Sequence, residues 1–234
     1  MGPRNFEREI SDCVFDLKDR DILSLLPTPF LIDAMCGEGM PQRNLDVGIR
    51  PSIEFSKMVG SSTTVKLKLA EDEASSDLMK MEDVYRTKSE SPSRIIVIEV
   101  PPELHGFGIV GDGAATLARM NGFVGALVEG AIRDTHALKE MGFPAFSRTI
   151  SPGSIMGKAS IASVGEPVLV GGQTIYEGDV IAADNDGVVV IRESELDRLV
   201  IRASAISERE EQGNRLVAEG KTWAEAEEIL GPRI

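Results

Sequence analysis

The fold is decided by residues 94–150, RIIVIEVPPELHGFGIVGDGAATLARMNGFVGALVEGAIRDTHALKEMGFPAFSRTI, in which short apolar runs alternate with short helical patterns. Buried strands are expected at 95–100, 123–128 and 144–150, and helices at 114–120 and 135–141. This alternation is typical of parallel α/β units, in which helices cover a sheet. The stretch therefore predicts a β-α-β-α-β unit.

The segment that precedes this unit predicts helices and one strand. Helical spacing of apolar residues over 6–17 indicates an amphipathic helix. Thr28 followed by Pro29 is typical of an N-cap with proline at the first helical position. Threonines and valines over 58–69 predict a strand, and the acidic, serine-rich passage 70–92 is expected to be an exposed helix that ends in a loop.

The segment that follows the unit predicts β-hairpins and then helices. Valine-rich runs within 161–191 are separated by turn sequences at 171–172, 177–179 and 184–187. A helix is expected from Ser194, and a capping box at Thr222–Glu225 indicates a last short helix. We expect a single domain of residues 1–234, with an N-terminal helical arm at about 1–40, a core at about 58–191 and C-terminal helices at about 194–231.

Composition limits the class of protein. The chain has 234 residues, of which 42% are hydrophobic, 27% charged and only 5% aromatic, so the core is expected to be aliphatic. The formal charge of −13 and the lack of a basic stripe argue against a nucleic-acid partner. Two cysteines suit an intracellular, cytoplasmic protein, and no apolar run approaches the roughly 18 residues of a membrane span.

Two loops of the β-α-β-α-β unit are candidate ligand sites. They are GFGIVGDG at 106–113 and EGAIRD at 129–134, and each leads from a strand into a helix. The carboxyl ends of parallel strands lie at one edge of a sheet, where ligands bind. We therefore expect the two loops to share one ligand.

The first loop allows two interpretations. Gly106, Gly108 and Gly111 have the GxGxxG spacing of a dinucleotide fold, in which Glu129 would bind the ribose. Five residues separate the preceding strand from the first glycine, and the later hairpins do not continue a dinucleotide fold. The simpler interpretation is that Gly111 and Gly113 let backbone amides at a helix N-terminus approach a small carboxylate.

The second loop contains Arg133 beside Asp134. Arginine can bind a carboxylate through two hydrogen bonds, and aspartate can bind a hard cation such as Mg²⁺. Together they suit a 2-oxo acid. The alternative is an ordinary surface ion pair that caps the helix from Thr135. Asp112 favours the ligand site, because it lies on the first loop and so at the same edge.

These residues carry a resemblance to a known family. Asp112, twenty residues and then Arg133-Asp134 lie within GDGAATLARMNGFVGALVEGAIRD, which GFPAFSR and GDVIAADNDGVVVI follow. The pattern, over about 108–191, resembles the family that joins 4-hydroxy-4-methyl-2-oxoglutarate aldolases with the ribonuclease-activity regulator A (RraA-like) proteins. The resemblance implies an α/β/β sandwich similar to a swivelling phosphohistidine domain. It also implies homotrimers or homohexamers with sites at subunit contacts.

The resemblance assigns roles by position. The backbone of Gly111, Asp112, Gly113 and Ala114 and the side chain of Arg133 would hold the pyruvate part of the substrate. Asp134 would be the direct ligand of Mg²⁺, Mn²⁺ or another divalent cation. Asp112 would hold water around that cation and assist proton transfer. Lys158 would lie near the substrate, and Glu210 from a neighbouring subunit would approach the metal's water, with Glu211 one residue away as the alternative. Both glutamates could equally form a solvated helix face.

The same resemblance implies the reaction. It would be class II cleavage of a 4-hydroxy-2-oxo acid, or decarboxylation of oxaloacetate, since both reactions pass through the pyruvate enolate. One departure is Ala137, where many catalytic members carry an acid, and the adjacent His136 is expected at the helix surface. His105 is expected to have a structural role. The alternative function is that of a non-catalytic regulatory protein, but such members commonly lack the aspartate found here as Asp134.

Overall fold

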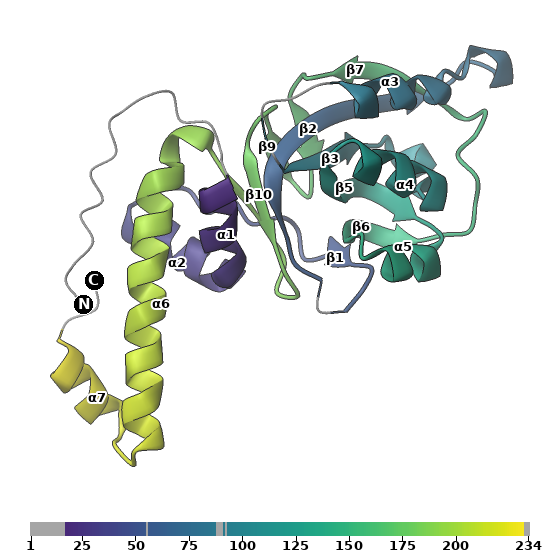
Figure 1. The fold of residues 1–234 in the computed structure, drawn as a ribbon. Coiled ribbons are helices and arrows are strands. Elements are labelled where there is room, and N and C mark those ends of the chain that lie inside the picture. The colour runs from purple at the N-terminus through teal and green to yellow at the C-terminus, as the bar shows by residue number, and fades with distance from the viewer. Residues whose placement is uncertain (1–16, 55, 88–90, 92, 232–234) are drawn as a thin grey trace.

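The structure, a computed structural model, describes residues 17–231 apart from 55, 88–90 and 92 (Figure 1). The helix expected over 6–17 lies outside these residues except for its last position. A curved sheet has the strand order β1 (Arg50–Pro51), β6 (Ala145–Ile150), β5 (Phe123–Ile132), β3 (Arg94–Glu99), β2 (Met58–Leu69), β10 (Val180–Ala183) and β11 (Val188–Ile191). Two further strands pair beside this path, β4 (Gly108–Val110) with β5 and β7 (Ala159–Val164) with β2.

The predicted β-α-β-α-β unit is confirmed. It consists of β3, α4 (Asp112–Met120), β5, α5 (Thr135–Met141) and β6, and its strands are parallel. The strand predicted over 58–69 is β2, which also pairs in parallel with β3. The sequence did not predict β4, because its three residues lie inside the glycine-rich loop 106–113.

Both faces of the sheet are covered, which makes three layers (Figure 1). Successive side chains of a strand point to opposite faces. On β3, Ile96 and Ile98 accordingly pack beneath α3 (Met81–Arg86), α4 and α5, whereas Ile95 and Val97 pack against the hairpin of β8 (Val168–Val170) and β9 (Gln173–Ile175). The α/β/β sandwich with helical arms is therefore confirmed.

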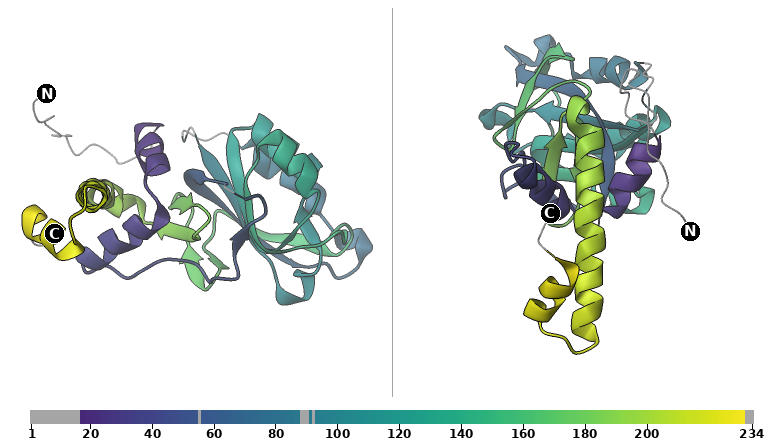
Figure 2. Two further views of the ribbon diagram at one scale, coloured as in Figure 1. Left: turned by 90° about the horizontal axis from the view of Figure 1, so that it is seen from below. Right: turned by 90° about the vertical axis from the view of Figure 1, so that its left-hand side faces the viewer.

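The arms lie beyond the β10–β11 side of the sheet (Figure 2). There α1 (Leu17–Leu25), α2 (Thr28–Gly37) and the first half of α6 (Leu196–Ala218) bury a third apolar cluster against β10 and β11. The second half of α6 extends away and packs against α7 (Trp223–Leu230), which begins at the predicted Thr222–Glu225 capping box.

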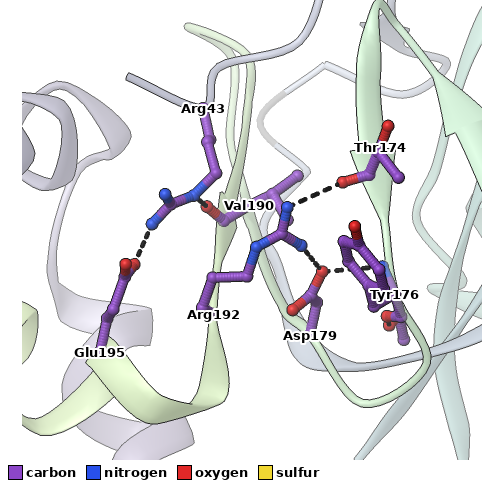
Figure 3. A network of polar contacts seen from close by, with 8 residues as sticks. Arg43, Thr174, Tyr176, Asp179, Val190, Arg192 and Glu195 are labelled. Atoms are coloured by element: carbon purple, nitrogen blue, oxygen red, sulfur yellow. Dashed lines mark hydrogen bonds and ion pairs between the residues drawn. The ribbon is translucent and has the colours of Figure 1, made fainter. Parts of the chain in front are cut away.

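A polar network fixes the start of α6 to the β-rich half (Figure 3). The carboxylate of Asp179 pairs with Arg192 and accepts the backbone N–H of Tyr176 at 2.8 Å. Arg43 pairs with Glu195, immediately before α6, and its Nε donates to the Val190 carbonyl at 3.2 Å. These contacts join the segment immediately before α6 to β9, to the residue before β10 and, through Arg43, to β11.

Three local predictions were wrong. Pro27, not Thr28, is the N-cap of α2, because the amide and hydroxyl of Thr28 donate to the Asp184 carboxylate at 2.8 and 2.7 Å. The turn at 177–179 joins β9 to β10, which are not paired, whereas those at 171–172 and 184–187 do close hairpins. The helix expected within 70–92 is present as α3, but it is not exposed throughout, since it buries Val84 and Tyr85 in the core.

Within the described residues, no helix is both long and apolar enough to cross a membrane.

Candidate functional site

The two predicted loops meet where β4 and β5 end and α4 and α5 begin (Figure 1). The backbone N–H of Arg133 donates to the Val110 carbonyl at 2.9 Å, so the second loop continues the pairing of β5 with β4. Gly108 and Gly111 leave the space that the Arg133 side chain fills, because a Cβ on Gly108 would come within 2.8 Å of the arginine Cβ. The glycines of the first loop thus admit the arginine of the second.

Asp134 has an unusual backbone conformation. Among the described residues it is the only non-glycine with a positive φ, at 55°, and it directly precedes α5. A non-glycine residue in this region carries local strain of about 1 kcal/mol, and such strain is concentrated at functional sites. Its side chain makes no capping hydrogen bond to α5. The side chain therefore does not cap α5, although the ion pair with Arg133 in that alternative is present.

The Asp134 carboxylate points instead toward the N-terminus of α4. Its Oδ2 accepts the backbone N–H of Asp112 at 3.1 Å and lies 3.4 Å from Nε of Arg133. The Asp112 carboxylate accepts the backbone N–H of Gly113 at 2.6 Å. The structure thus brings Asp112, Arg133 and Asp134 together. The backbone of 111–114 was predicted to hold the substrate, and two of its amides donate to protein carboxylates in this structure.

A cavity of about 370 Å³ opens beside these residues. Gly111, Asp112, Gly113, Ala114 and Arg133 form its polar end. The predicted loop 106–113 also contributes Gly108 and Ile109. The other walls come from residues that the sequence did not predict to line a site, namely Leu67, Leu78, Met79, Met81, Glu82, Tyr85, Ile98, Leu117, Ser154, Ile155 and Met156. Burial raises the pKa of Tyr85 above its ordinary value, so this side chain is a neutral phenol.

The passage 78–85 supplies much of that wall. Its signal in the sequence was the helical spacing of Leu78, Met81, Val84 and Tyr85, which marks an apolar face. An apolar face indicates that a helix packs against something. It does not indicate that the contact surrounds a cavity.

Lys158 and Glu210 are not brought to this cavity within one chain. The Lys158 ammonium lies 5.0 Å from the centre of the Phe107 ring, and the lysine is not among the cavity-lining residues. Glu210 is exposed on the second half of α6, which lies on the opposite side of the molecule from α4 and α5 (Figures 1 and 2). Its predicted role needs a second subunit and stays a prediction.

The dinucleotide alternative does not fit the structure. Glu129, the expected ribose ligand, pairs with Arg148 and accepts the Gly171 N–H at 2.6 Å. These contacts tie β5 to β6 and to the β8–β9 hairpin. Gly108 and Gly111 accommodate Arg133, so their spacing serves the packing of the protein itself.

Two histidines have the expected positions. His136 is exposed on α5, 3.5 Å from the Glu140 carboxylate. His105 lies with Nε2 2.9 Å from the Val100 carbonyl, which is a structural contact between the end of β3 and the glycine loop.

The carboxylates suit a cation that keeps most of its water. In the part of the chain that the structure describes, no three His, Cys, Asp or Glu side chains form a metal-binding group. Mg²⁺ is usually bound through one or two carboxylates, with water and substrate oxygens completing its shell. Asp134, with Asp112 next to it, fits that pattern. A site for Zn²⁺, which takes three or four protein ligands, does not fit.

Known proteins resemble this chain in sequence and in fold. The family model described as RraA-like (Aldolase/RraA) matches residues 28–190. A protein of Halalkalibacterium halodurans, described as "Putative 4-hydroxy-4-methyl-2-oxoglutarate aldolase", is 32% identical over 197 residues, which are 83% of this chain and 86% of that protein.

Solved structures share the fold. An uncharacterised protein from Pseudomonas syringae pv. tomato has a TM-score of 0.77 at 24% identity, covering 91% of this chain and 98% of that one. RraAS2 of Streptomyces coelicolor, titled an unusual member of the RNase ES inhibitor RraA family, has a TM-score of 0.72 at 21% identity, covering 85% and 96%. The chain therefore belongs to the RraA-like (Aldolase/RraA) family, as its sequence motifs predicted.

Proposed function

We propose that this protein is a divalent-metal-dependent carbon–carbon lyase that forms the enolate of pyruvate. The substrate would be a 4-hydroxy-2-oxo acid, cleaved in a retro-aldol reaction, or oxaloacetate, which is decarboxylated. The observation that carries the proposal is the meeting of Asp112, Arg133 and Asp134 at one edge of the sheet, beside a cavity. The "Putative" aldolase of H. halodurans supports the same class of reaction.

The site would use its charges as follows. Asp134 would bind the cation directly, and Asp112 would hold water near it. A divalent cation supplies Lewis-acid polarisation of the 2-oxo group. Arg133, with a half-buried side chain, would bind the substrate carboxylate through its planar guanidinium. The positive N-terminal end of α4 would add to the stabilisation of the enolate's negative charge.

Proton transfer would fall to Asp112. Its side chain is exposed at the mouth of the site, and the Gly113 amide fixes one of its oxygens at 2.6 Å. In retro-aldol cleavage the 4-hydroxyl loses its proton, the C3–C4 bond breaks, and C3 later gains a proton. Water held by Asp112 would exchange those protons with solvent.

The site would be completed by assembly. The second half of α6 packs against α7 within its own chain, and it carries Glu210 on an exposed surface. In a homotrimer or homohexamer, Glu210 of one subunit would approach the carboxylates of the next. Glu211 pairs with Arg215 along the helix, which makes it the weaker candidate.

A pyruvate-release assay tests the proposal. The protein is treated with a chelator and assayed on oxaloacetate and on 4-hydroxy-4-methyl-2-oxoglutarate, with and without added Mg²⁺ or Mn²⁺. Reactions without protein correct for spontaneous and metal-driven decarboxylation. We expect metal-dependent release that the chelator abolishes. A regulatory protein would release no pyruvate above the protein-free rate with either metal, and that result would contradict the proposal.

A further inference from the structure

The two ends of the cavity differ in chemical character. Its polar end is formed by Asp112, Arg133 and the backbone of α4. The rest of the lining is mostly apolar and is called the apolar end below; it includes Leu67, Leu78, Met81, Tyr85, Ile98 and Ile155. About 370 Å³ is the size of pockets that enclose ligands considerably larger than pyruvate. The cavity thus has room for a substituent beyond the reacting carbons, and that room is mostly apolar.

The charges of the lining residues disfavour a second carboxylate at the apolar end. Among the described lining residues the charged side chains are Glu82, Asp112 and Arg133, so Arg133 is the single cation. It already lies beside Asp134 and would hold the substrate's first carboxylate. Glu82 pairs at 2.6 Å with Arg86, which does not line the cavity. Within one chain, a second carboxylate would lose water there without gaining a cationic partner, which is costly.

The apolar wall is held in place by bonds to the sheet. The Asp77 carboxylate, next to Leu78, accepts the Ile161 N–H of β7 at 2.8 Å. Ser76 donates from its hydroxyl to the Ala159 carbonyl at 2.7 Å. Tyr85 packs edge-on against the Phe123 ring, with centroids 5.5 Å apart. The cavity is thus a formed part of the protein, and its shape can select among substrates.

From these observations we infer the substrate class of the site. The preferred substrate is a 4-hydroxy-2-oxo acid whose C4 carries an apolar alkyl or aryl group in place of a second carboxylate. This inference rests on the proposed function. The C4 hydroxyl proton is removed, the C3–C4 electron pair passes to the enolate of pyruvate, and C4 becomes the carbonyl carbon of an apolar aldehyde or ketone. Protonation at C3 then yields pyruvate, and no oxidant or reductant is needed.

A substrate panel tests the inference. Pyruvate release is measured for 4-hydroxy-2-oxo-4-phenylbutanoate, 4-hydroxy-2-oxooctanoate and 4-hydroxy-4-methyl-2-oxoglutarate at a fixed Mg²⁺ concentration. We expect kcat/KM at least about tenfold higher for the two apolar substrates, since a few methylene groups in an apolar pocket give this discrimination. Equal or higher kcat/KM for the dicarboxylate would overturn the inference.

A separate readout reports on the proposed function alone. Exchange of the pyruvate methyl protons with D₂O, followed by NMR, requires enolate formation but no substituent in the apolar end. Exchange of the pyruvate methyl protons together with a higher kcat/KM for the dicarboxylate would overturn the inferred substrate class but not the proposed lyase activity. Absence of both exchange and pyruvate release would overturn the lyase, and with it the inference.

Two lysine substitutions test where the selectivity arises. Met81→Lys places a cation at the apolar end, whereas Met120→Lys makes the same change on α4 at a side chain that is 79% exposed and outside the cavity. We expect Met81→Lys to lower the ratio of kcat/KM for the phenyl substrate over the dicarboxylate by about tenfold or more, and Met120→Lys to leave that ratio unchanged. Leu78→Lys provides the same test if Met81→Lys does not fold. An unchanged ratio in a folded cavity variant would overturn the inference.

Binding of uncleavable compounds gives a second line of evidence. The ligands 2-oxo-4-phenylbutanoate and 2-oxoglutarate lack the 4-hydroxyl, so calorimetry in Mg²⁺ measures affinity alone. We expect tighter binding of the phenyl compound by the wild-type protein and loss of that preference in Met81→Lys. Tighter binding of 2-oxoglutarate by the wild-type protein would contradict the assigned substrate class.

Discussion

Gly111→Ala is the substitution that tests the site geometry most sharply. The backbone at Gly111, φ −130° and ψ −166°, is open to any residue, so the glycine is not required for its conformation. It is required for space, because a Cβ would overlap Asp134 Oδ2 and come within 3.0 Å of both Cγ and Nε of Arg133. The added methyl group must displace the two side chains on which the proposed chemistry depends.

The size of the effect follows from that displacement. Moving a catalytic group by about 1 Å costs about 10² in rate, or about 2.7 kcal/mol of transition-state stabilisation. Both affected side chains are partly exposed, so we expect the free energy of unfolding to fall by only about 1 kcal/mol, at the low end for overpacking. The experiment measures kcat/KM for pyruvate release together with urea unfolding.

Gly106→Ala is the matched control for this variant. Gly106 lies on the same loop, does not line the cavity, and has nothing within 4 Å of an added Cβ. We expect its kcat/KM to stay within about twofold of the wild type, since an unhindered methyl moves no reacting group. Wild-type kcat/KM in Gly111→Ala would show that turnover does not depend on the positions of Arg133 and Asp134, which would contradict the proposed site.

Three further predictions concern Arg133, the assembly of subunits and the cavity wall at 76–85. Arg133→Lys should lower kcat/KM nearly as much as Gly111→Ala, since an ammonium replaces a planar guanidinium that can donate two parallel hydrogen bonds. An unchanged kcat/KM would indicate that Arg133 forms only an ordinary surface ion pair. Glu210→Gln should still form a trimer or hexamer by light scattering and bind Mg²⁺ but turn over much more slowly, since a proton-accepting charge is lost, and an active wild-type monomer at assay concentration would contradict the shared site. The hydrogen bond from the Ile161 N–H lowers the pKa of Asp77, so this bond is present above the ordinary value of 3.8 and is lost as the pH falls through the lowered pKa. Amide hydrogen exchange in 76–85 should therefore become faster, relative to exchange in β3, below that lowered pKa. Exchange that changes equally in the two segments would count against the role of Asp77 in anchoring 76–85.

The sequence predicted the central unit well because its signals are local. Alternating apolar runs, and glycine residues at the ends of the helices, located β3, β5 and β6 and the helices between them. The expected parallel pairing of these strands placed the loops that carry Asp112 and Arg133 at one edge of the sheet. The capping box at Thr222 was correct for the same reason, since the bonds that define it span three residues.

The errors have a common physical origin in long-range contacts. Thr28 resembled an N-cap, but Asp184, 156 residues away, takes its amide and hydroxyl. Glu129 resembled a ribose ligand until Arg148 and Gly171 were seen to bind it. The helix within 70–92 was expected to be exposed because its sequence is acidic, whereas its apolar face packs against residues distant in the sequence, such as Phe123.

Asp134→Ala provides the most direct test of the central claim. Pyruvate release from oxaloacetate is measured across an Mg²⁺ titration for the chelator-treated wild-type and variant proteins, with circular dichroism to check the fold. Asp134 is exposed and makes no core contact, so the fold should persist, while loss of such an electrostatic group costs about 10² to 10³ in rate. We expect a folded variant with that loss at every Mg²⁺ concentration. A folded variant with wild-type, Mg²⁺-dependent turnover would contradict it.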